Sequence, residues 1–131
     1  MKRVITFGTF DLLHIGHVRI IERAAALGHY LIVGVSSDAL NFKKKQCYPA
    51  YSQYDRMSIV LALKGVDEVF LEESLEEKEK YIKHFKADIL VMGDDWAGKF
   101  DHLSHCCEII YLPRTPDIST SSIKEFLKEV S

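Results

Sequence analysis

The feature that most constrains this chain is a short junction near its N-terminus, where an apolar run meets a glycine and then a helical pattern. Residues 4–7 are β-branched or aromatic, and Gly8 follows them where a strand of an α/β protein would end. From residue 18 to residue 27, apolar side chains recur at helical spacing, and Gly28 ends the pattern. A strand that turns through glycine into a helix predicts the first βα unit of a parallel sheet.

Two histidines lie at the start of this predicted helix. His14 and His17 are three residues apart, at or just before the first turn, where unpaired N–H groups and the helix dipole favour an anion. Gly16 lies between them and removes a side chain where a phosphate would approach the backbone. A lone histidine in this place is most often a cap or a surface residue. The pair with its glycine predicts a phosphate site.

The rest of the chain repeats the alternation of strand and helix. Apolar runs predict strands at residues 30–35, 66–71, 89–92 and 109–112. Helical patterns are found at residues 52–63, with Ser52 as a cap, at 75–85, at 99–106 and from 119 onward. The helix at 75–85 is so charged that we expect it to be a solvated outer face, and residues 41–49 form a basic, turn-rich segment. The chain is therefore predicted to be one α/β domain, residues 1–131, with a Rossmann-like, doubly wound parallel sheet of about five strands.

Composition excludes several classes of function. The net charge of −2 gives no reason to expect a nucleic acid or an anionic membrane as partner. No apolar run reaches the roughly 18–20 residues that span a bilayer, and the N-terminus has no signal-peptide pattern. Three cysteines, two of them adjacent, form a poor disulfide framework. We therefore expect a cytoplasmic protein that is not inserted in a membrane.

Residues 102–107 contain two histidines and two adjacent cysteines, which could suggest a zinc site. The segment lacks the C-x2-C type of ligand spacing and continues into an apolar strand. On this basis a zinc site is not predicted.

The carboxyl ends of parallel strands meet at one edge of a sheet, and polar residues follow the first, second, fourth and fifth predicted strands of this chain. They are Thr9 with the two histidines, Asp38, residues 93–96, and Arg114 with Thr115. The G-x-G-x-x-G fingerprint of dinucleotide sites and the Walker lysine loop are both missing from the sequence. The topology therefore predicts a phosphate-binding site of another kind at this edge.

Residues 8–17 read Gly-Thr-Phe-Asp-Leu-Leu-His-Ile-Gly-His and resemble the signature of the nucleotidyltransferases, in which H-x-G-H follows G-x-F-D. Residues 114–120 match a second signature of that family, R-T-x-x-I-S-T. Residues 92–101 are similar to the segment that the glycerol-3-phosphate cytidylyltransferases carry after their fourth strand. The resemblance to this subfamily covers nearly all 131 residues. It implies in-line attack of a phosphate monoester, most simply glycerol 3-phosphate, on the α-phosphate of CTP.

The resemblance also implies roles for individual residues. The catalytic groups would be His14, His17, Lys44 and Arg114, with the choice among the three lysines 43–45 left open. The nucleotide would be held by Thr9, Phe10, Gly16, Asp38, Arg56, Gly93, Asp95, Arg114, Thr115, Ser119 and Thr120. The acceptor would be contacted by Asp11, Lys64 and Trp96, and the role of Asp11 stays open between taking part in the magnesium–triphosphate complex and anchoring the local structure. Two positions depart from the family pattern: Lys64 replaces an arginine and Asp117 replaces a glycine.

The family further implies Mg2+ bound through the CTP phosphates, a homodimer, and no structural zinc. Three alternatives stay open at this point. The first is a cytidylyltransferase for another small phosphorylated acceptor. The second is an adenylyltransferase of the same superfamily, which shares these motifs and differs in nucleotide preference. The third is a nucleotide sensor of the same fold, which would bind CTP without releasing pyrophosphate.

Overall fold

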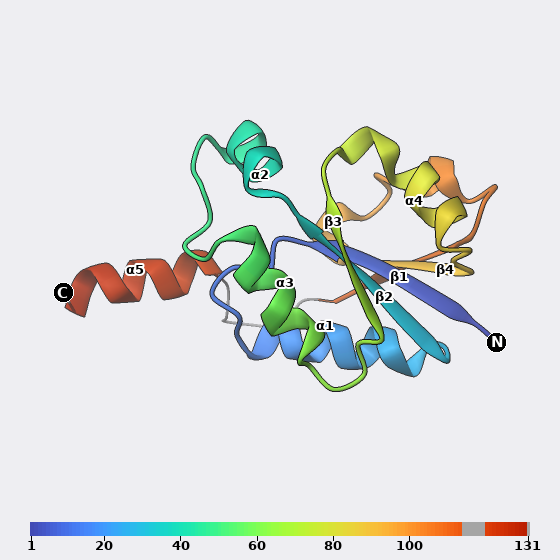
Figure 1. The fold of residues 1–131 in the computed structure, drawn as a ribbon, viewed down its shortest axis with the longest axis horizontal. Helices are drawn as coiled ribbons and strands as arrows, with labels where there is room; N and C mark the ends of the chain where they lie inside the picture. The colour runs from blue at the N-terminus through green and yellow to red at the C-terminus, as the bar shows by residue number, and fades with distance from the viewer. Residues whose placement is uncertain (114–119, 131) are drawn as a thin grey trace.

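Five parallel strands form the centre of the fold in the computed structural model, which describes residues 1–113 and 120–130 (Figure 1). The strands are β1 (Arg3–Gly8), β2 (Tyr30–Ser36), β3 (Glu68–Glu72), β4 (Ile89–Gly93) and β5 (Glu108–Leu112), and their order in the sheet is β3-β2-β1-β4-β5. The order reverses between β1 and β4, and ligands of such sheets bind beside this point, outside the carboxyl ends of the strands. The predicted five-stranded, Rossmann-like sheet is confirmed.

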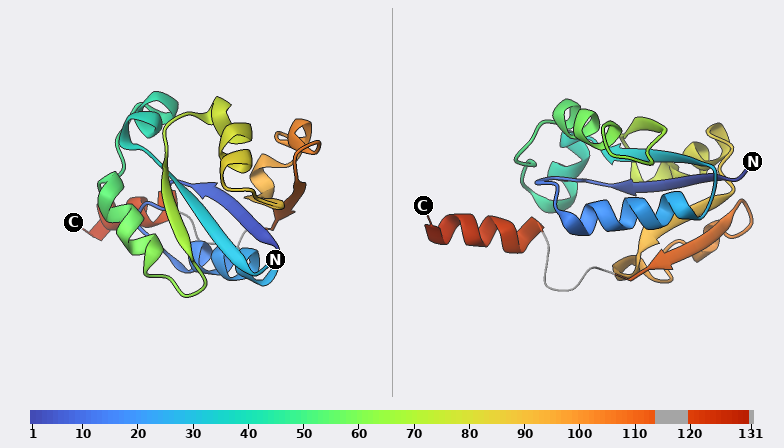
Figure 2. Two further views of the ribbon diagram at one scale, coloured as in Figure 1. Left: turned by 45° about the vertical axis from the view of Figure 1, so that its right-hand side comes forward. Right: turned by 90° about the horizontal axis from the view of Figure 1, so that it is seen from below.

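Helices cover both faces of the sheet (Figures 1 and 2). On one face α1 (Ile15–Ala26) and α3 (Gln53–Leu61) bury Ile21, Ala24 and Val60 against Val4 and neighbouring strand residues. On the other face, α4 (Lys78–His84) and the 3-10 turn η3 (Asp101–Leu103) pack onto Ile5 and Phe7. The helix α5 (Thr120–Val130) extends away from this body. Among the described residues, no helix is long and apolar enough to cross a membrane.

The basic segment after β2 is more regular than predicted. Its first part belongs to a helix, α2 (Asp38–Lys45), where the sequence suggested turns. The side chain of Ser37 accepts a hydrogen bond from the Leu40 N–H and caps the helix, and Asp38 lies in the first turn. The three lysines occupy the last turn, where they complement the negative end of the helix dipole.

The charged helix predicted at residues 75–85 is not wholly solvated. It consists of a 3-10 turn, η1 (Leu75–Glu77), followed by α4, and it buries both Ile82 and Lys78. The Lys78 ammonium is 2.5 Å from Glu72 Oε2 and lies 4.4 Å from the centre of the Phe7 ring. This internal ion pair explains how a charged residue can be buried here.

Close packing in the middle of the sheet depends on one glycine. A Cβ atom on Gly34 would lie 2.6 Å from the Phe7 ring and 2.7 Å from the Phe70 ring. These two rings pack edge to face, with centroids 5.7 Å apart. Glycine in β2 therefore leaves room for the aromatic cluster under α4.

Candidate active site

A cavity of about 420 Å3 opens at the carboxyl edge of the sheet. Residues at the ends of β1 and β4 line it, so it lies where the strand order reverses. Other parts of its wall come from the start of α1, the segment after α2, and Lys124 of α5. The predicted site residues that line it are Thr9, Phe10, Asp11, His14, Gly16, His17, Gly93, Asp95 and Trp96.

The two histidines lie face to face at the N-terminus of α1. Their ring centroids are 3.9 Å apart, and the planes are inclined by 27°. Nδ1 of His14 accepts a hydrogen bond from the Gly16 N–H (3.0 Å), and Nδ1 of His17 accepts one from the His14 N–H (3.1 Å). Because a backbone N–H can only donate, each neutral imidazole carries its proton on Nε2. The pair therefore offers two Nε2–H donors that the helix backbone does not use.

Both imidazoles are held in the neutral form. Burial and the neighbouring His14 lower the pKa of His17 to about 4, although Asp11 acts in the opposite direction. Burial also lowers the pKa of His14. A phosphate placed beside the rings would raise both pKa values again, because a nearby negative charge favours the protonated imidazole. The pair can thus donate hydrogen bonds in the free protein and gain proton affinity as negative charge approaches.

The loop between β1 and α1 is fixed by the buried carboxylate of Asp11. Its oxygens accept hydrogen bonds from the backbone N–H groups of Ala50 (2.8 Å) and Tyr51 (3.1 Å), and Oδ2 lies 3.3 Å from Lys124 Nζ. Burial alone would raise the pKa of Asp11, but these partners outweigh it, so the pKa lies below its usual value. The sequence leaves open whether Asp11 takes part in substrate binding or anchors the loop. In this structure Asp11 ties the first loop to the segment after α2, and it also lines the cavity.

Two neighbours of Asp11 have left-handed backbone conformations. Phe10 has φ 55° and Leu12 has φ 46°, values that are uncommon outside glycine. Phe10 is buried, and its ring centroid lies 5.5 Å from that of His17. Strained residues of this kind persist where surrounding contacts hold them, and they cluster at functional sites.

Thr9 is held from the side of α2. Its hydroxyl donates to Asn41 Oδ1 (2.8 Å), and the Asn41 amide donates to the carbonyl oxygens of Ser36 and Ser37. Asn41 is a buried polar residue that sequence reasoning missed, because residues 41–49 were interpreted as turns. Of its two apolar neighbours Leu40 is buried and Phe42 is exposed, so the local pattern does not mark Asn41 as inward-facing.

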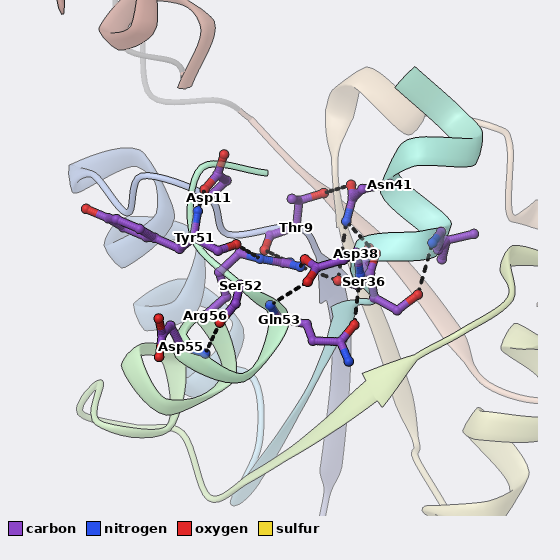
Figure 3. A network of polar contacts seen from close by, with 12 residues as sticks. Thr9, Asp11, Ser36, Asp38, Asn41, Tyr51, Ser52, Gln53, Asp55 and Arg56 are labelled. Atoms are coloured by element: carbon purple, nitrogen blue, oxygen red, sulfur yellow. Dashed lines mark hydrogen bonds and ion pairs between the residues drawn. The ribbon is translucent and has the colours of Figure 1, made fainter. Parts of the chain in front are cut away.

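Arg56 holds the loops next to the cavity together without lining the cavity itself (Figure 3). Its side chain is 0% exposed, and its guanidinium donates to the carbonyl oxygens of Thr9, Ser36 and Tyr51. Its remaining nitrogen lies 2.6 Å from Asp38 Oδ1. Neither Arg56 nor Asp38 lines the cavity. The nucleotide contacts of these two residues stay predictions, and in this structure the pair joins the segments that carry Thr9, Ser36 and Tyr51.

The lysines of α2 face different surroundings. Lys45 lines the cavity, whereas Lys44 does not. Lys44 is partly buried, which lowers its pKa, and it senses the charges of Glu72 and Lys78. The sequence favours Lys44 as the phosphate contact and leaves Lys43 and Lys45 open. In this structure Lys45 is the one of the three that lines the cavity, because a helical turn directs neighbouring side chains to different sides.

The turn after β4 forms the opposite wall. Asp95 and Trp96 lie in the 3-10 turn η2 (Asp94–Trp96), directly after Gly93. A Cβ atom on Gly93 would lie 2.7 Å from Asp95 Oδ1, so glycine lets the carboxylate fold back over the backbone. The Trp96 ring packs against Phe100, with centroids 5.5 Å apart. This wall combines one acceptor group with an aromatic surface.

The remaining predicted residues lie elsewhere. Lys64 is exposed in a separate depression between α1 and α3, together with Val18 and Glu22, so the structure does not bring it to the cavity. Arg114, Thr115 and Ser119 lie outside the described residues, and Thr120 is described only as the first residue of α5. Two further lysines, Lys45 and Lys124, also line the cavity. No local sequence pattern marks Lys124, which contacts Asp11 from near the C-terminus.

The cavity offers few carboxylates for a metal ion. Of the described residues that line it, Asp11 and Asp95 carry this group, and the oxygens of Asp11 already serve two N–H groups and Lys124. Mg2+ in nucleotide sites is usually held by one or two carboxylates together with substrate phosphates. The donor set therefore fits an ion that arrives bound to a triphosphate, with Asp95 as the available protein ligand.

Comparisons with known proteins agree with this geometry. The sequence profile of the family described as cytidylyltransferase-like matches residues 5–126. The glycerol-3-phosphate cytidylyltransferase of Bacillus subtilis (strain 168) is 50% identical over 95% of this chain and 96% of its own. The glycerol-3-phosphate cytidylyltransferase of Staphylococcus aureus (strain NCTC 8325 / PS 47) is 47% identical over 97% of this chain and 96% of its own.

A solved structure supports the same grouping at the level of the fold. The lipopolysaccharide core biosynthesis protein from Thermoplasma volcanium superimposes with a TM-score of 0.74 at 25% identity, covering 88% of this chain and 98% of its own. The chain belongs to the cytidylyltransferase-like family, and it resembles the glycerol-3-phosphate cytidylyltransferases along almost its whole length.

Proposed function

We propose that this protein transfers CMP from CTP to glycerol 3-phosphate, forming CDP-glycerol and releasing pyrophosphate. The observation that carries the proposal is the stacked pair His14 and His17, whose Nε2–H donors lie at a helix N-terminus and line the cavity at the sheet edge. Family membership supplies the nucleotide and the acceptor, since two relatives at 47–50% identity bear the name glycerol-3-phosphate cytidylyltransferase.

The reaction is a direct displacement at phosphorus. A phosphate oxygen of glycerol 3-phosphate attacks the α-phosphorus of CTP, the bond from that phosphorus to the α,β-bridging oxygen breaks, and pyrophosphate leaves with the electron pair. Such a step requires alignment and charge stabilisation rather than a covalent nucleophile. We assign the two Nε2–H groups to the oxygens on which negative charge grows, namely those of the α-phosphate and the bridging position.

Other groups would hold the triphosphate. Lys45 supplies a cation at the cavity wall, and the N-terminal N–H groups of α1 favour an anion beside Gly16. We keep the family roles of Arg114, Thr115, Ser119 and Thr120 as contacts to the β- and γ-phosphates. Their presence in the sequence as R-T-x-x-I-S-T supports this assignment.

Mg2+ is part of the proposal. It would neutralise part of the charge of the triphosphate, and it would be held through phosphate oxygens, with Asp95 as the protein group within reach of the cavity. Among the described residues that line the cavity, Asp11 is already paired and Asp95 is the other carboxylate, which supports binding through the phosphates over a cage of protein ligands.

Base and acceptor recognition fall to the wall formed after β4. Asp95 can accept a hydrogen bond from the cytosine amino group or from the ribose, and the Trp96 ring can pack against the acceptor. Lys64 would reach an acceptor only from another molecule or after a rearrangement, because it lies outside the cavity.

We also propose that the protein is a homodimer in the cytoplasm. Phe126 and Leu127 are 61% and 49% exposed on α5, a helix that leaves the body of the domain, and a second copy could cover them. The described cysteines are free thiols, as expected in a reducing compartment. Sedimentation velocity of the purified chain tests the dimer, and a single monomeric species at micromolar concentration would refute it.

The decisive assay is pyrophosphate release in the presence of Mg2+. CTP and ATP are each combined with glycerol 3-phosphate and with a panel of other polyol and sugar phosphates. We expect release with CTP and glycerol 3-phosphate. Release with ATP alone would identify an adenylyltransferase, and binding of CTP without release under any combination would identify a nucleotide sensor.

The histidine assignment is tested by His17→Ala. Loss of one transition-state donor should lower kcat by at least about a hundredfold, while far-UV circular dichroism stays unchanged. The matched control is His84→Ala, an exposed histidine at the end of α4 that should leave kcat unaffected. Near-normal turnover of the His17 variant would remove this residue from the mechanism.

A further inference from the structure

A second group of metal-binding side chains lies outside the cavity. Glu79 in the first turn of α4 meets His105 and Cys106, which precede β5, and the three possible ligand atoms lie within 4.8 Å of one another. We propose that these residues bind one Zn2+ ion, which joins α4 to the chain segment entering β5. This site is separate from the proposed transferase function and does not depend on it.

The orientation of His105 favours a cation. Its Nδ1 lies 2.9 Å from the carbonyl oxygen of His102, which can only accept, so Nδ1 carries a proton. In the neutral ring Nε2 then holds a lone pair, and it points at Glu79 Oε1 at 2.6 Å. Two lone pairs cannot face each other at this distance without a proton or a metal ion between them. An imidazole fixed by a carbonyl on Nδ1 is also the usual arrangement of a zinc ligand.

The distances are close to those of a tetrahedral site. Zn–S bonds of about 2.3 Å and Zn–N or Zn–O bonds of about 2.0–2.1 Å place sulfur about 3.5 Å from the other ligand atoms, and nitrogen about 3.3 Å from oxygen. Cys106 Sγ lies 3.4 Å from His105 Nε2 and 3.6 Å from Glu79 Oε1. The nitrogen–oxygen pair alone must separate, from the 2.6 Å of a hydrogen bond.

The ligand types select zinc among the common cellular ions. A thiolate and an imidazole are poor ligands for Mg2+ or Ca2+ and good ones for Zn2+, with the carboxylate as third ligand and water completing the shell. Binding displaces the thiol proton of Cys106 and any proton on Nε2 of His105. Lys83 also contacts Glu79, at 3.6 Å, but its side chain is 66% exposed, so this weak ion pair can be given up at little cost.

Adjacent residues define the limits of the site. Cys107 packs into the apolar cluster under α4 and interacts with the backbone of Leu90, so it faces the core. Glu79 lies 26 residues before His105 in the sequence, so a pattern of closely spaced cysteine and histidine ligands does not include it. The segment between β4 and β5 carries Asp95 and Trp96 near one end and two of the zinc ligands, His105 and Cys106, near the other. The ion would therefore anchor the loop that forms one wall of the cavity.

Cobalt provides the test, because Co2+ bound tetrahedrally with a thiolate absorbs visible light and shows a sulfur-to-metal charge-transfer band. The reduced full-length chain is titrated with Co2+ alone, without nucleotide, and then with Zn2+. We expect saturation at about one Co2+ per chain, and bleaching by about one Zn2+. Cys106→Ser should abolish the charge-transfer band, and His105→Ala or Glu79→Gln should weaken Zn2+ binding at least about tenfold.

Matched variants distinguish this site from the catalytic cavity, which contains its own histidines and Cys47. Cys47→Ser and His102→Ala, a change of an exposed histidine three residues before His105, should leave both the band and the Zn2+ affinity unchanged. Loss of the band in Cys47→Ser with retention in Cys106→Ser would place the ion in the cavity and overturn the proposal. Absence of a charge-transfer band in the unmodified chain would overturn it as well.

Discussion

Replacement of Arg56 by lysine tests the idea that this residue is a structural centre of the site. Arg56 makes four contacts: 3.0 Å to Tyr51 O, 2.8 Å to Thr9 O, 2.8 Å to Ser36 O and 2.6 Å to Asp38 Oδ1. Lysine keeps the charge but has one nitrogen, which cannot reach partners on three loops at once. We expect Arg56→Lys to fold and to lose part of this network.

The magnitude follows from the number of contacts. If lysine fails to satisfy two of the four, and each hydrogen bond to a charged donor contributes about 1.5 kcal/mol, the free energy of unfolding falls by about 3 kcal/mol. A domain of this size has about 5–15 kcal/mol in total. Arg56→Met removes the charge and leaves Asp38 unpaired, so it should cost more, about 3–5 kcal/mol.

Urea denaturation followed by circular dichroism measures these changes at constant m-value. The control is Arg23→Lys, an exposed arginine whose guanidinium donates to the Pro113 carbonyl oxygen, and it should change the free energy of unfolding by less than about 0.5 kcal/mol. A loss below about 1 kcal/mol in Arg56→Lys, combined with a raised KM for CTP, would refute the structural role and restore a nucleotide contact.

Three further outcomes follow from single side chains. The pKa of His17 is about 4 in the folded chain and 6.5 for an ordinary histidine, so the unfolded chain binds the extra proton between these values and stability falls as pH drops from 6.5 towards 4. The loss is about 2–3 kcal/mol after allowance for partial exposure, and His17→Asn, measured by denaturation across this pH range, should lack it. Lys45→Ala should raise the KM for CTP more than Lys44→Ala in steady-state assays, and the reverse order would return the phosphate contact to Lys44. Glu72→Gln leaves the buried Lys78 ammonium without its carboxylate and should lower the free energy of unfolding by about 3–5 kcal/mol in urea titrations; a loss under 1 kcal/mol would show that the buried ion pair contributes little to stability.

Local sequence patterns were sufficient to predict the strands and the geometry of the first loop. The strands β1, β2 and β4 are buried on both faces, so each appears in the sequence as a continuous apolar run that can be recognised without knowing its neighbours in the sheet. Gly16 and the two histidines lie within four residues, so their mutual geometry follows from one helix start. The helix α2 was missed because three lysines in a row obscure its weak apolar pattern, and its stability comes from a serine cap and a buried asparagine.

The sequence by itself determined the fold class, the alternation of strands and helices, and the position of the histidine pair, because each depends on neighbours a few residues apart. Only the tertiary structure decided which charged groups face the cavity. From the sequence Arg56 could serve either a nucleotide or a set of carbonyl oxygens, and in the folded chain it is buried against Thr9, Ser36 and Asp38. The same holds for Asp11 with Lys124 and for Glu79 with His105, since contacts between residues far apart in sequence exist only after the chain has folded.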